Sequence, residues 1–226
     1  MEFFLDTASI EQIKRHQDLG LVDGVTTNPA LLSAEGRNPL KQLEEITSLV
    51  SGPVSAEVVE TEPERIVAHA KKLAQIADNI VVKIPASRTG LEAANQLQDT
   101  GIKLLVTLNF HATQAVPFIK LGVAYVAIFI GRSEDFAIDN KQISWDTRKA
   151  IDNINSPTRL MAASIRNPDY LIDSISAAAD VITVPPVCWE KVYQNPIFEM
   201  AEREFLESWR KLPADLRADY ETFDIK

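Results

Sequence analysis

Short apolar runs alternate with longer amphipathic segments along the chain, and this alternation constrains the fold more than any other feature. Each run is rich in β-branched or aromatic residues, which is typical of a strand buried on both faces. The segments between the runs favour helices, so the pattern predicts repeated strand–helix units and a parallel sheet. The runs cover residues 2–6, 23–28, 53–59, 79–85, 103–108, 124–130, 159–164 and 180–185.

Eight such units within 226 residues match the compact end of the closed α/β barrel known as the TIM (β/α)8 barrel. A doubly wound open sheet is the alternative architecture for the same alternation. No Pro-, Gly- or Ser-rich linker divides the chain. We therefore expect one barrel domain over residues 1–194, followed by an extra C-terminal helix and tail over residues 195–226.

Residues 61–77 illustrate the helical segments, because one face of a helix there would carry Ile66, Ala70, Leu73 and Ala77. Thr61 precedes Pro63 and Glu64, and this order predicts a capping box at the start of the helix. The helix should therefore begin directly after Thr61.

Composition excludes several classes of function. The net charge of −9 and the pI near 4.9 disfavour binding to nucleic acid or to anionic membranes. The single cysteine, Cys188, forms no internal disulfide and is expected to be buried. The start of the chain lacks the basic and apolar regions of a signal peptide, and no run is long enough to span a membrane. We expect a soluble, cytoplasmic protein.

The three histidines lack the spacing of metal ligands, so we predict no metal site. His16 and His69 lie in helical patterns and are expected to face water. His111 follows the fifth run and is expected to begin a helix.

Polar or ionisable residues stand at the carboxyl ends of seven of the eight runs. In a parallel barrel these ends meet at one rim, where the active site of such folds lies. Strand ends are often polar, so each residue alone means little, but their convergence predicts a functional site. The residues concerned are Asp6, Thr26, Asn28, Glu57, Lys83, Thr107, Arg132, Ser164 and Arg166.

Lys83 is the most unusual of these residues, since it interrupts the apolar run "NIVVKIP". One interpretation is a lysine at the edge of the core that is paired with a carboxylate. The other is a desolvated amine, which has a lowered pKa and is partly neutral and nucleophilic near pH 7. Such an amine forms a Schiff base with a carbonyl. Asp6 and Glu57 lie at neighbouring strand ends and favour the second interpretation.

The motifs "FLDTAS", "GVTTNP", "SAEV" and "VVKIP" occur in the order and spacing of the transaldolase family. The likeness continues through "VTLNFHATQA", "GVAYVAIFIGR" and "AASIRNP", so it covers nearly the whole chain. The sequence resembles the small, single-barrel branch of that family, which also contains fructose-6-phosphate aldolase.

The resemblance implies catalytic roles for four residues. Lys83 would form the Schiff base with a ketose phosphate, and Asp6 would remove the proton from the C4 hydroxyl. An N-terminal helix cap is the alternative role for Asp6. Glu57 would act through a water during formation and hydrolysis of the imine, and Thr107 would hydrogen-bond that water.

The resemblance also implies a substrate-binding set of six residues. Thr26 and Asn28 would hold the hydroxyls of the dihydroxyacetone unit, although Asn28 before a proline also suits a turn. Phe129 would lie near the sugar. The expected phosphate ligands are Arg132, Ser164 and Arg166, since arginine offers a planar pair of donors.

Two positions depart from the usual transaldolase pattern. Leu105 stands where transaldolases commonly carry Asn, and Ala127 stands where they commonly carry Ser. Both resemble the aldolase branch. Glu57 and Phe129 are instead transaldolase-like, where the aldolase carries Gln and Tyr. Because these two positions manage protons, we favour transaldolase.

The predicted reaction transfers dihydroxyacetone from sedoheptulose 7-phosphate to glyceraldehyde 3-phosphate, giving erythrose 4-phosphate and fructose 6-phosphate in the pentose phosphate pathway. It needs neither cofactor nor metal. The alternatives are a fructose-6-phosphate aldolase-like lyase that releases dihydroxyacetone, and a non-catalytic sugar-phosphate-binding assembly protein.

The C-terminal helix predicts self-association. Phe198, Ala201, Phe205 and Trp209 fall on one of its faces. The eight barrel units are complete before this helix begins, so its aromatic face needs another surface to cover it. The family branch forms rings, and we expect a homo-oligomer, a pentamer or decamer, in which this helix packs on a neighbouring subunit.

Overall fold

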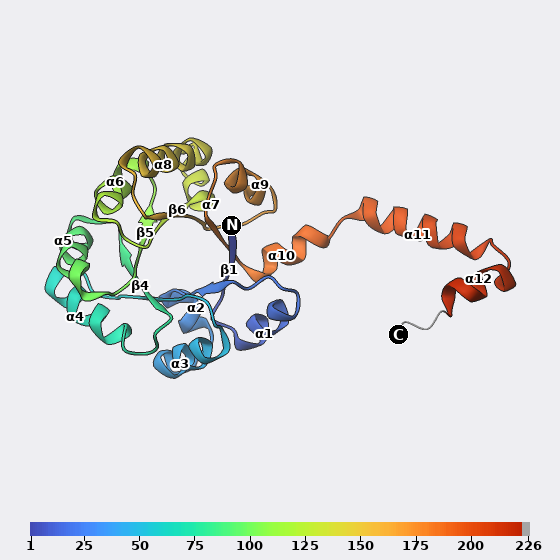
Figure 1. The fold of residues 1–226 in the computed structure, drawn as a ribbon, viewed down its shortest axis with the longest axis horizontal. Coiled ribbons are helices and arrows are strands. Elements are labelled where there is room, and N and C mark those ends of the chain that lie inside the picture. The colour runs from blue at the N-terminus through green and yellow to red at the C-terminus, as the bar shows by residue number, and fades with distance from the viewer. Residues whose placement is uncertain (223–226) are drawn as a thin grey trace. The chain divides into compact units, whose positions relative to one another are not determined.

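The computed structural model describes residues 1–222 and contains one closed parallel barrel (Figure 1). Each strand pairs with its neighbours in chain order, and β8 returns to pair with β1. Every predicted apolar run overlaps one strand, so the (β/α)8 barrel is confirmed over the open sheet. The strands are β1 (Glu2–Asp6), β2 (Gly24–Thr26), β3 (Val54–Glu57), β4 (Ile80–Pro85), β5 (Leu104–Asn109), β6 (Tyr125–Phe129), β7 (Arg159–Ala163) and β8 (Val181–Val184).

Helices surround this barrel as an outer ring (Figure 1). They bury the outward faces of the strands, which explains why the strand sequences are apolar on both sides. The helices up to the end of β8 are α1 (Ile10–Asp18), α2 (Pro29–Ala34), α3 (Pro39–Leu49), α4 (Pro63–Leu73), α5 (Arg88–Leu97), α6 (Ala112–Leu121), α7 (Ile130–Glu134), α8 (Asn140–Ile154) and α9 (Asp169–Ser176), with a short 3-10 turn at Gln98–Thr100.

Side-chain caps fix where several helices begin. Ser9 caps α1 and His111 caps α6, each by accepting a hydrogen bond from a backbone amide of the first turn, so the expected role of His111 is confirmed. Ser9, not Asp6, is the cap of the first helix, which leaves the Asp6 carboxylate for another role.

The predicted capping box of the fourth helix is wrong. Helix α4 begins at Pro63, and its N-cap is Glu62, which makes no side-chain capping bond. Proline at the first position already fixes the backbone angle and lacks an amide hydrogen, so one of the unpaired donors is absent. Thr61 lies outside the helix.

Two residues outside the rim also test the sequence predictions. Cys188 is buried, as expected. His16 was predicted to face water but is fully buried in α1, where its Nδ1 lies 2.8 Å from the carbonyl oxygen of Gln12. A histidine that pairs with its own helix backbone can be buried without any other partner, so the helical pattern alone did not reveal it.

The barrel interior is filled by side chains, with its lower end closed by aromatic residues. Phe4 and Tyr125 lie edge to face, with ring centroids 6.2 Å apart. Arg159 lies over the Tyr125 ring at 5.4 Å and pairs with Glu2 at 3.0 Å. These contacts stand at the amino ends of the strands, where barrel residues serve stability. The opposite end is left open for a site.

The chain divides into two compact units, Met1–Trp189 and Glu190–Lys226. Helix α10 (Pro186–Tyr193) spans the division, and the second unit contains α11 (Pro196–Arg210) and α12 (Ala214–Glu221). Trp209 of α11 packs on α12, since its Nε1 donates to Glu221 at 2.8 Å and its ring lies 5.0 Å from that of Tyr220. The sequence predicted α11 but not the short α12. Within residues 1–222, none of the helices combines the length and hydropathy needed to cross a bilayer.

Candidate active site

A cavity of about 120 Å³ opens at the carboxyl ends of the strands. It collects side chains from seven of the eight strands and from the segments that follow them. Most of the residues predicted from the strand ends line it, and Glu57, Thr107 and Arg166 lie beside it. The lining residues are Asp6, Thr26, Asn28, Lys83, Leu105, Ala127, Phe129, Arg132, Met161, Ala163, Ser164 and Thr183.

Strand register brings the ionisable residues to one level. Lys83 of β4 lies opposite Glu57 of β3, and Asp6 of β1 lies opposite Thr26 of β2. Because the strands are parallel and paired in chain order, these four neighbours form one continuous side of the rim. The convergence expected from the sequence is therefore confirmed for this side.

Lys83 is buried, with 6% of its surface exposed. Its Nζ lies 3.2 Å from Glu57 Oε2 and donates to the carbonyl oxygen of Thr27, also at 3.2 Å. The amine therefore meets both interpretations of the sequence: it is paired with a carboxylate, and it faces the cavity. A proton can pass from Nζ to Glu57 along this contact, which leaves the nitrogen lone pair available for attack.

Two threonine hydroxyl groups form a chain of hydrogen bonds that ends on Asp6. Thr26 Oγ1 donates to Asp6 Oδ1 at 2.8 Å and lies 2.5 Å from Thr183 Oγ1. Since each hydroxyl carries one hydrogen, Thr183 must donate to Thr26. Burial raises the pKa of Asp6 above its ordinary value of 3.8, while the charge of Lys83 and the bond from Thr26 oppose that shift. A carboxyl with a raised pKa is suited to taking and returning a proton.

Thr183 is a site residue that the strand-end analysis missed. It lies within β8, the one run whose end supplied no polar group, and it is buried. Its side chain reaches the cavity because it points inward one residue before the strand ends. The alternation of β8 was the available signal, although alternation alone does not give the level of a residue in the barrel.

Asn28 has a structural role as well as a place in the cavity wall. Its Oδ1 accepts from the amide of Leu31 at 2.9 Å and so caps α2. Because of this cap, the helix fixes the Asn28 side chain and the direction of its amide group. Asn28 is thus a helix cap, where the sequence suggested a turn, and the cap leaves its Nδ2 able to donate to a sugar hydroxyl.

Glu57 lies between the cavity and a second depression. This depression has a volume of about 700 Å³, and we call it the α2–α4 groove. Its lining is mostly apolar and includes the basic residues Arg37, His69 and Lys72. The full lining comprises Pro29, Leu32, Ser33, Arg37, Pro39, Leu40, Leu43, Glu57, Val59, His69, Lys72, Leu73 and Ile76.

Thr107 lies beside an irregularity of β5. The register of β5 against β6 shifts between Val106 and Asn109, and Leu108 takes the left-handed φ of 63°. Asn109 bridges the shift by donating to the carbonyl oxygens of Val106 and Ala127, both at 3.0 Å. Thr107 Oγ1 is buried and forms no hydrogen bond among the described residues. Bulges of this kind commonly redirect a side chain next to an active site.

The wall opposite Asp6 is apolar. Leu105, Ala127, Met161 and Ala163 belong to the buried core cluster and also line the cavity. Phe129 stands above them and contacts Phe110 edge to face, with ring centroids 5.5 Å apart. The two departures noted in the sequence, at 105 and 127, therefore fall together on this wall.

The predicted phosphate ligands divide into two groups. Arg132 and Ser164 line the cavity, and the Arg132 guanidinium carbon lies 5.9 Å from the centre of the Phe129 ring. Ser164 takes a left-handed φ of 59°, a conformation that is rare for serine and often marks a functional turn. Arg166 lies outside the lining and forms an ion pair with Asp135 at 2.6 Å.

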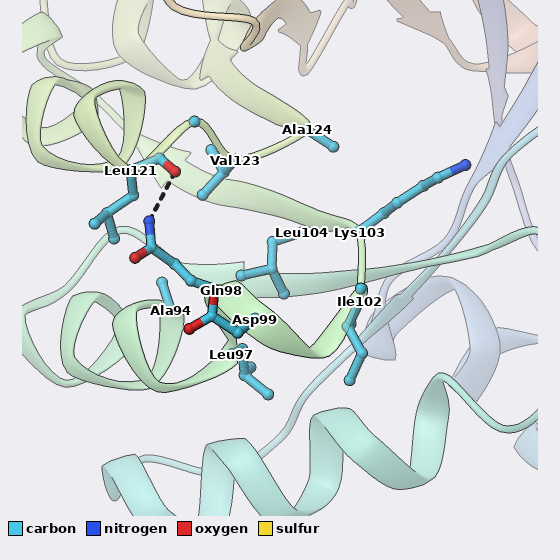
Figure 2. A pocket seen from close by; sticks show the side chains of 12 residues that line it. Ala94, Leu97, Gln98, Asp99, Ile102, Lys103, Leu104, Leu121, Val123 and Ala124 are labelled. Atoms are coloured by element: carbon cyan, nitrogen blue, oxygen red, sulfur yellow. Dashed lines mark hydrogen bonds between the residues drawn. The ribbon is translucent and has the colours of Figure 1, made fainter.

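A further cavity of about 430 Å³ lies at the other end of the barrel (Figure 2). It is bordered by the start of β5 at Leu104 and by Ala124 just before β6, and Gln98 donates to Leu121 across it at 2.9 Å. None of the predicted site residues lines this cavity, so its larger volume does not make it the catalytic site. Among residues 1–222, no cluster of three or more His, Cys, Asp or Glu side chains could hold a metal ion.

Comparison with known proteins gives extensive matches. A family model described as transaldolase/fructose-6-phosphate aldolase matches residues 3–222. A "probable transaldolase" of Ruegeria sp. (strain TM1040) is 44% identical over 91% of this chain and 95% of its own length. Similar proteins of the same description occur in Lactiplantibacillus plantarum, with 42% identity over 95% of this chain and 99% of theirs, and in Hydrogenobaculum sp. (strain Y04AAS1), with 40% over 94% and 98%. The matches include the segment beyond the barrel.

Proposed function

The chain belongs to the transaldolase/fructose-6-phosphate aldolase family, and on this basis we propose that it is a transaldolase that works through a Schiff base on Lys83. One observation carries the proposal: a buried lysine lies 3.2 Å from Glu57 on the wall of a cavity that Asp6 also lines. A nucleophilic amine and two carboxylates are the groups that reversible cleavage of a ketose requires.

The proposed reaction begins at the keto carbon of the donor sugar phosphate. Lys83 attacks this carbon, and loss of water through Glu57 and a water held by Thr107 gives the protonated imine. Asp6 then takes the proton of the C4 hydroxyl, the C3–C4 bond breaks, and its electron pair moves into the imine to form an enamine. The shortened aldose phosphate leaves.

Transfer completes the cycle. The enamine carbon attacks the aldehyde of the acceptor, Asp6 returns its proton to the new hydroxyl, and water hydrolyses the imine to free Lys83. With sedoheptulose 7-phosphate and glyceraldehyde 3-phosphate the products are erythrose 4-phosphate and fructose 6-phosphate, as in the pentose phosphate pathway. Arg132, Ser164 and Arg166 are proposed to bind the phosphate, with Thr26 and Asn28 on the dihydroxyacetone hydroxyls.

A lyase that releases dihydroxyacetone is the second candidate. The apolar side chains of Leu105 and Ala127 in the cavity wall favour it, since they resemble the aldolase branch. Glu57 and Phe129 favour transfer, because neither places a phenol or an amide where it could assist protonation of the enamine. We favour transfer for this reason.

Borohydride trapping tests the Schiff base. The protein is mixed with fructose 6-phosphate and reduced, and its intact mass is measured. We expect one adduct in the wild type and in Lys103→Ala, an exposed lysine of the opposite barrel end, and none in Lys83→Ala. No adduct in the wild type would reject the mechanism. Adding erythrose 4-phosphate or glyceraldehyde 3-phosphate then separates transfer from release of free dihydroxyacetone.

We further propose that the protein is a homo-oligomer joined by residues 195–226. Several large apolar side chains of α11 are exposed, among them Phe198 at 59% and Phe205 at 75%. The α2–α4 groove of another copy is a suitable acceptor, because it is apolar and carries Arg37, His69 and Lys72, whereas α11 carries Glu199, Glu202, Glu204 and Glu207. Apolar surface and opposite charges would be buried together.

The mass in solution tests the assembly. Deletion of residues 195–226, or Phe205→Glu alone, should lower the mass measured by light scattering. Ile172→Glu, at a similarly exposed position of α9 outside this segment, is the matched control. An unchanged mass after the deletion would reject the proposal.

A further inference from the structure

Arg166 is held by Asp135, the residue that caps the C-terminal end of α7. Its Nη1 donates to both carboxylate oxygens of Asp135, at 2.6 and 2.8 Å. Arg132 and Ser164 line the cavity, while Arg166 and Asp135 stand next to it and are about half exposed. The residue that caps α7 therefore determines where this arginine points.

Gly131 forms the surface on which the Arg166 stem rests. A Cβ atom at position 131 would lie 2.8 Å from Arg166 Cδ and 2.9 Å from Cγ, which is too close for a side chain. The Gly131 amide also donates to the carbonyl oxygen of Ser164 at 3.0 Å. The start of α7 and the loop after β7 are thus locked together, with the Arg166 stem between them and its head on Asp135.

The charges around Asp135 fit a role as a counterion. The hydrogen bond from Arg166 lowers the pKa of Asp135 below its ordinary value, and the charge of Arg132 adds to this effect. Asp135 is therefore a carboxylate at neutral pH. Two arginines at one rim repel each other, and a carboxylate beside both reduces that repulsion before any anion binds.

The form of the contact distinguishes two roles for Asp135. A carboxylate that competed with phosphate for Arg166 would grip the guanidinium by two different nitrogens, as phosphate does. Asp135 instead binds one corner, Nη1, with both of its oxygens. A contact of this form holds one nitrogen of the guanidinium in place.

We propose that Asp135 is a positioning residue for phosphate recognition, which holds Arg166 so that its guanidinium faces a phosphate ester bound against Arg132 and Ser164. The proposal rests on the phosphate-binding role given to these residues under the proposed function. It makes Asp135 a determinant of specificity for phosphorylated sugars over neutral ones, since a substrate without phosphate gains nothing from an oriented Arg166.

Asp135→Ala tests the proposal in the full-length protein. The dissociation constant of inorganic phosphate is measured by calorimetry, and KM and kcat are measured with fructose 6-phosphate as donor. We expect the dissociation constant and KM to rise about two- to fivefold, the scale expected when a half-exposed charged side chain loses its ion-pair partner. We expect kcat to change less than twofold, and trapping of unphosphorylated dihydroxyacetone on Lys83 to be unchanged.

A double-mutant cycle with Arg166→Ala separates positioning from general damage. If Asp135 acts through Arg166, then Asp135→Ala has no further effect on phosphate binding in the Arg166→Ala background. Asp135→Glu, which keeps the carboxylate, should recover part of the lost affinity. Neither result is expected if the residue merely stabilises α7.

Three outcomes would overturn the inference: an unchanged phosphate affinity, an equal loss in the Arg166→Ala background, or tighter phosphate binding, which would make Asp135 a competitor. The calorimetric measurement needs no catalysis. Failure of the wild type to form a Schiff base would therefore reject the proposed function while leaving the phosphate measurement to decide this inference separately.

Discussion

Ala127→Ser places a hydroxyl on the apolar wall of the cavity, next to the carbon skeleton that Lys83 would bind. Ala127 is 1% exposed in β6, and Leu105 and Met161 line the same wall. A serine there adds one oxygen without changing the strand. Because the sugar unit carries hydroxyls and this wall offers no polar partner, the new group should hydrogen-bond the bound ketose.

The expected size follows from one hydrogen bond. A bond between neutral groups contributes about 0.5–1.5 kcal/mol net. Since about 1.4 kcal/mol corresponds to a factor of ten, KM for fructose 6-phosphate should fall about two- to twelvefold. The same hydroxyl is buried without substrate, so the free energy of unfolding should fall by about 1 kcal/mol.

Initial rates with fructose 6-phosphate as donor and an aldose phosphate as acceptor measure the effect. Ala162→Ser is the matched control, because Ala162 is equally buried in the neighbouring strand β7 but does not line the cavity. We expect the control to lose stability without any gain in KM. An Ala127→Ser enzyme with wild-type KM, or a control with the same change in KM, would refute the reasoning.

Three further predictions follow from other contacts. Burial raises the pKa of Asp6, so the folded protein binds this proton at a higher pH than the unfolded chain, and the effect favours folding in acid but opposes it as pH rises through the raised pKa. Asp6→Asn should therefore unfold with a higher free energy than the wild type at pH 7, a gain that shrinks on acidification towards pH 3.8, while transfer falls about 10²–10⁴-fold and trapping on the lysine persists. Thr183→Val removes the donor to Thr26 and so weakens the hydrogen bonding to Asp6. The pKa of Asp6 should rise, and the acidic limb of the pH–rate profile should move to higher pH. Arg159→Met breaks the half-exposed pair with Glu2, and thermal unfolding should show a loss of about 1 kcal/mol or less with unchanged kcat.

The sequence predicted the barrel and much of its rim for a physical reason. Parallel strands joined by helices are apolar on both faces, so a polar residue such as Lys83 stands out at the point where a strand ends. Once the strands close into a barrel, all such ends lie on one level, and residues far apart in the chain become neighbours. The pairing of Lys83 with Glu57 is the clearest instance.

The remaining features depend on geometry that the sequence pattern does not contain. The role of Asp135 requires the direction in which the short helix α7 leaves β6, and that direction places its carboxylate on Arg166. The inward level of Thr183 depends on the stagger of β8 in the closed barrel. The burial of His16 depends on a hydrogen bond to its own helix, which leaves the sequence periodicity unchanged.

The distribution of polar groups around the cavity bears on whether the enamine is transferred or protonated. Asp6, Thr26 and Lys83 stand on one side, whereas the wall of Ala127 and Phe129 carries no proton donor. An enamine whose carbon faces a wall without proton donors is protonated slowly, so it survives until an aldehyde arrives and Asp6 returns its proton to the new hydroxyl. Phe129→Tyr places one phenol on this apolar wall and is the smallest change that would alter the balance between transfer and protonation. Without acceptor, we expect the release of free dihydroxyacetone from fructose 6-phosphate to rise relative to the rate of transfer. An unchanged ratio in a variant that still forms the Lys83 adduct would show that the apolar wall does not protect the enamine.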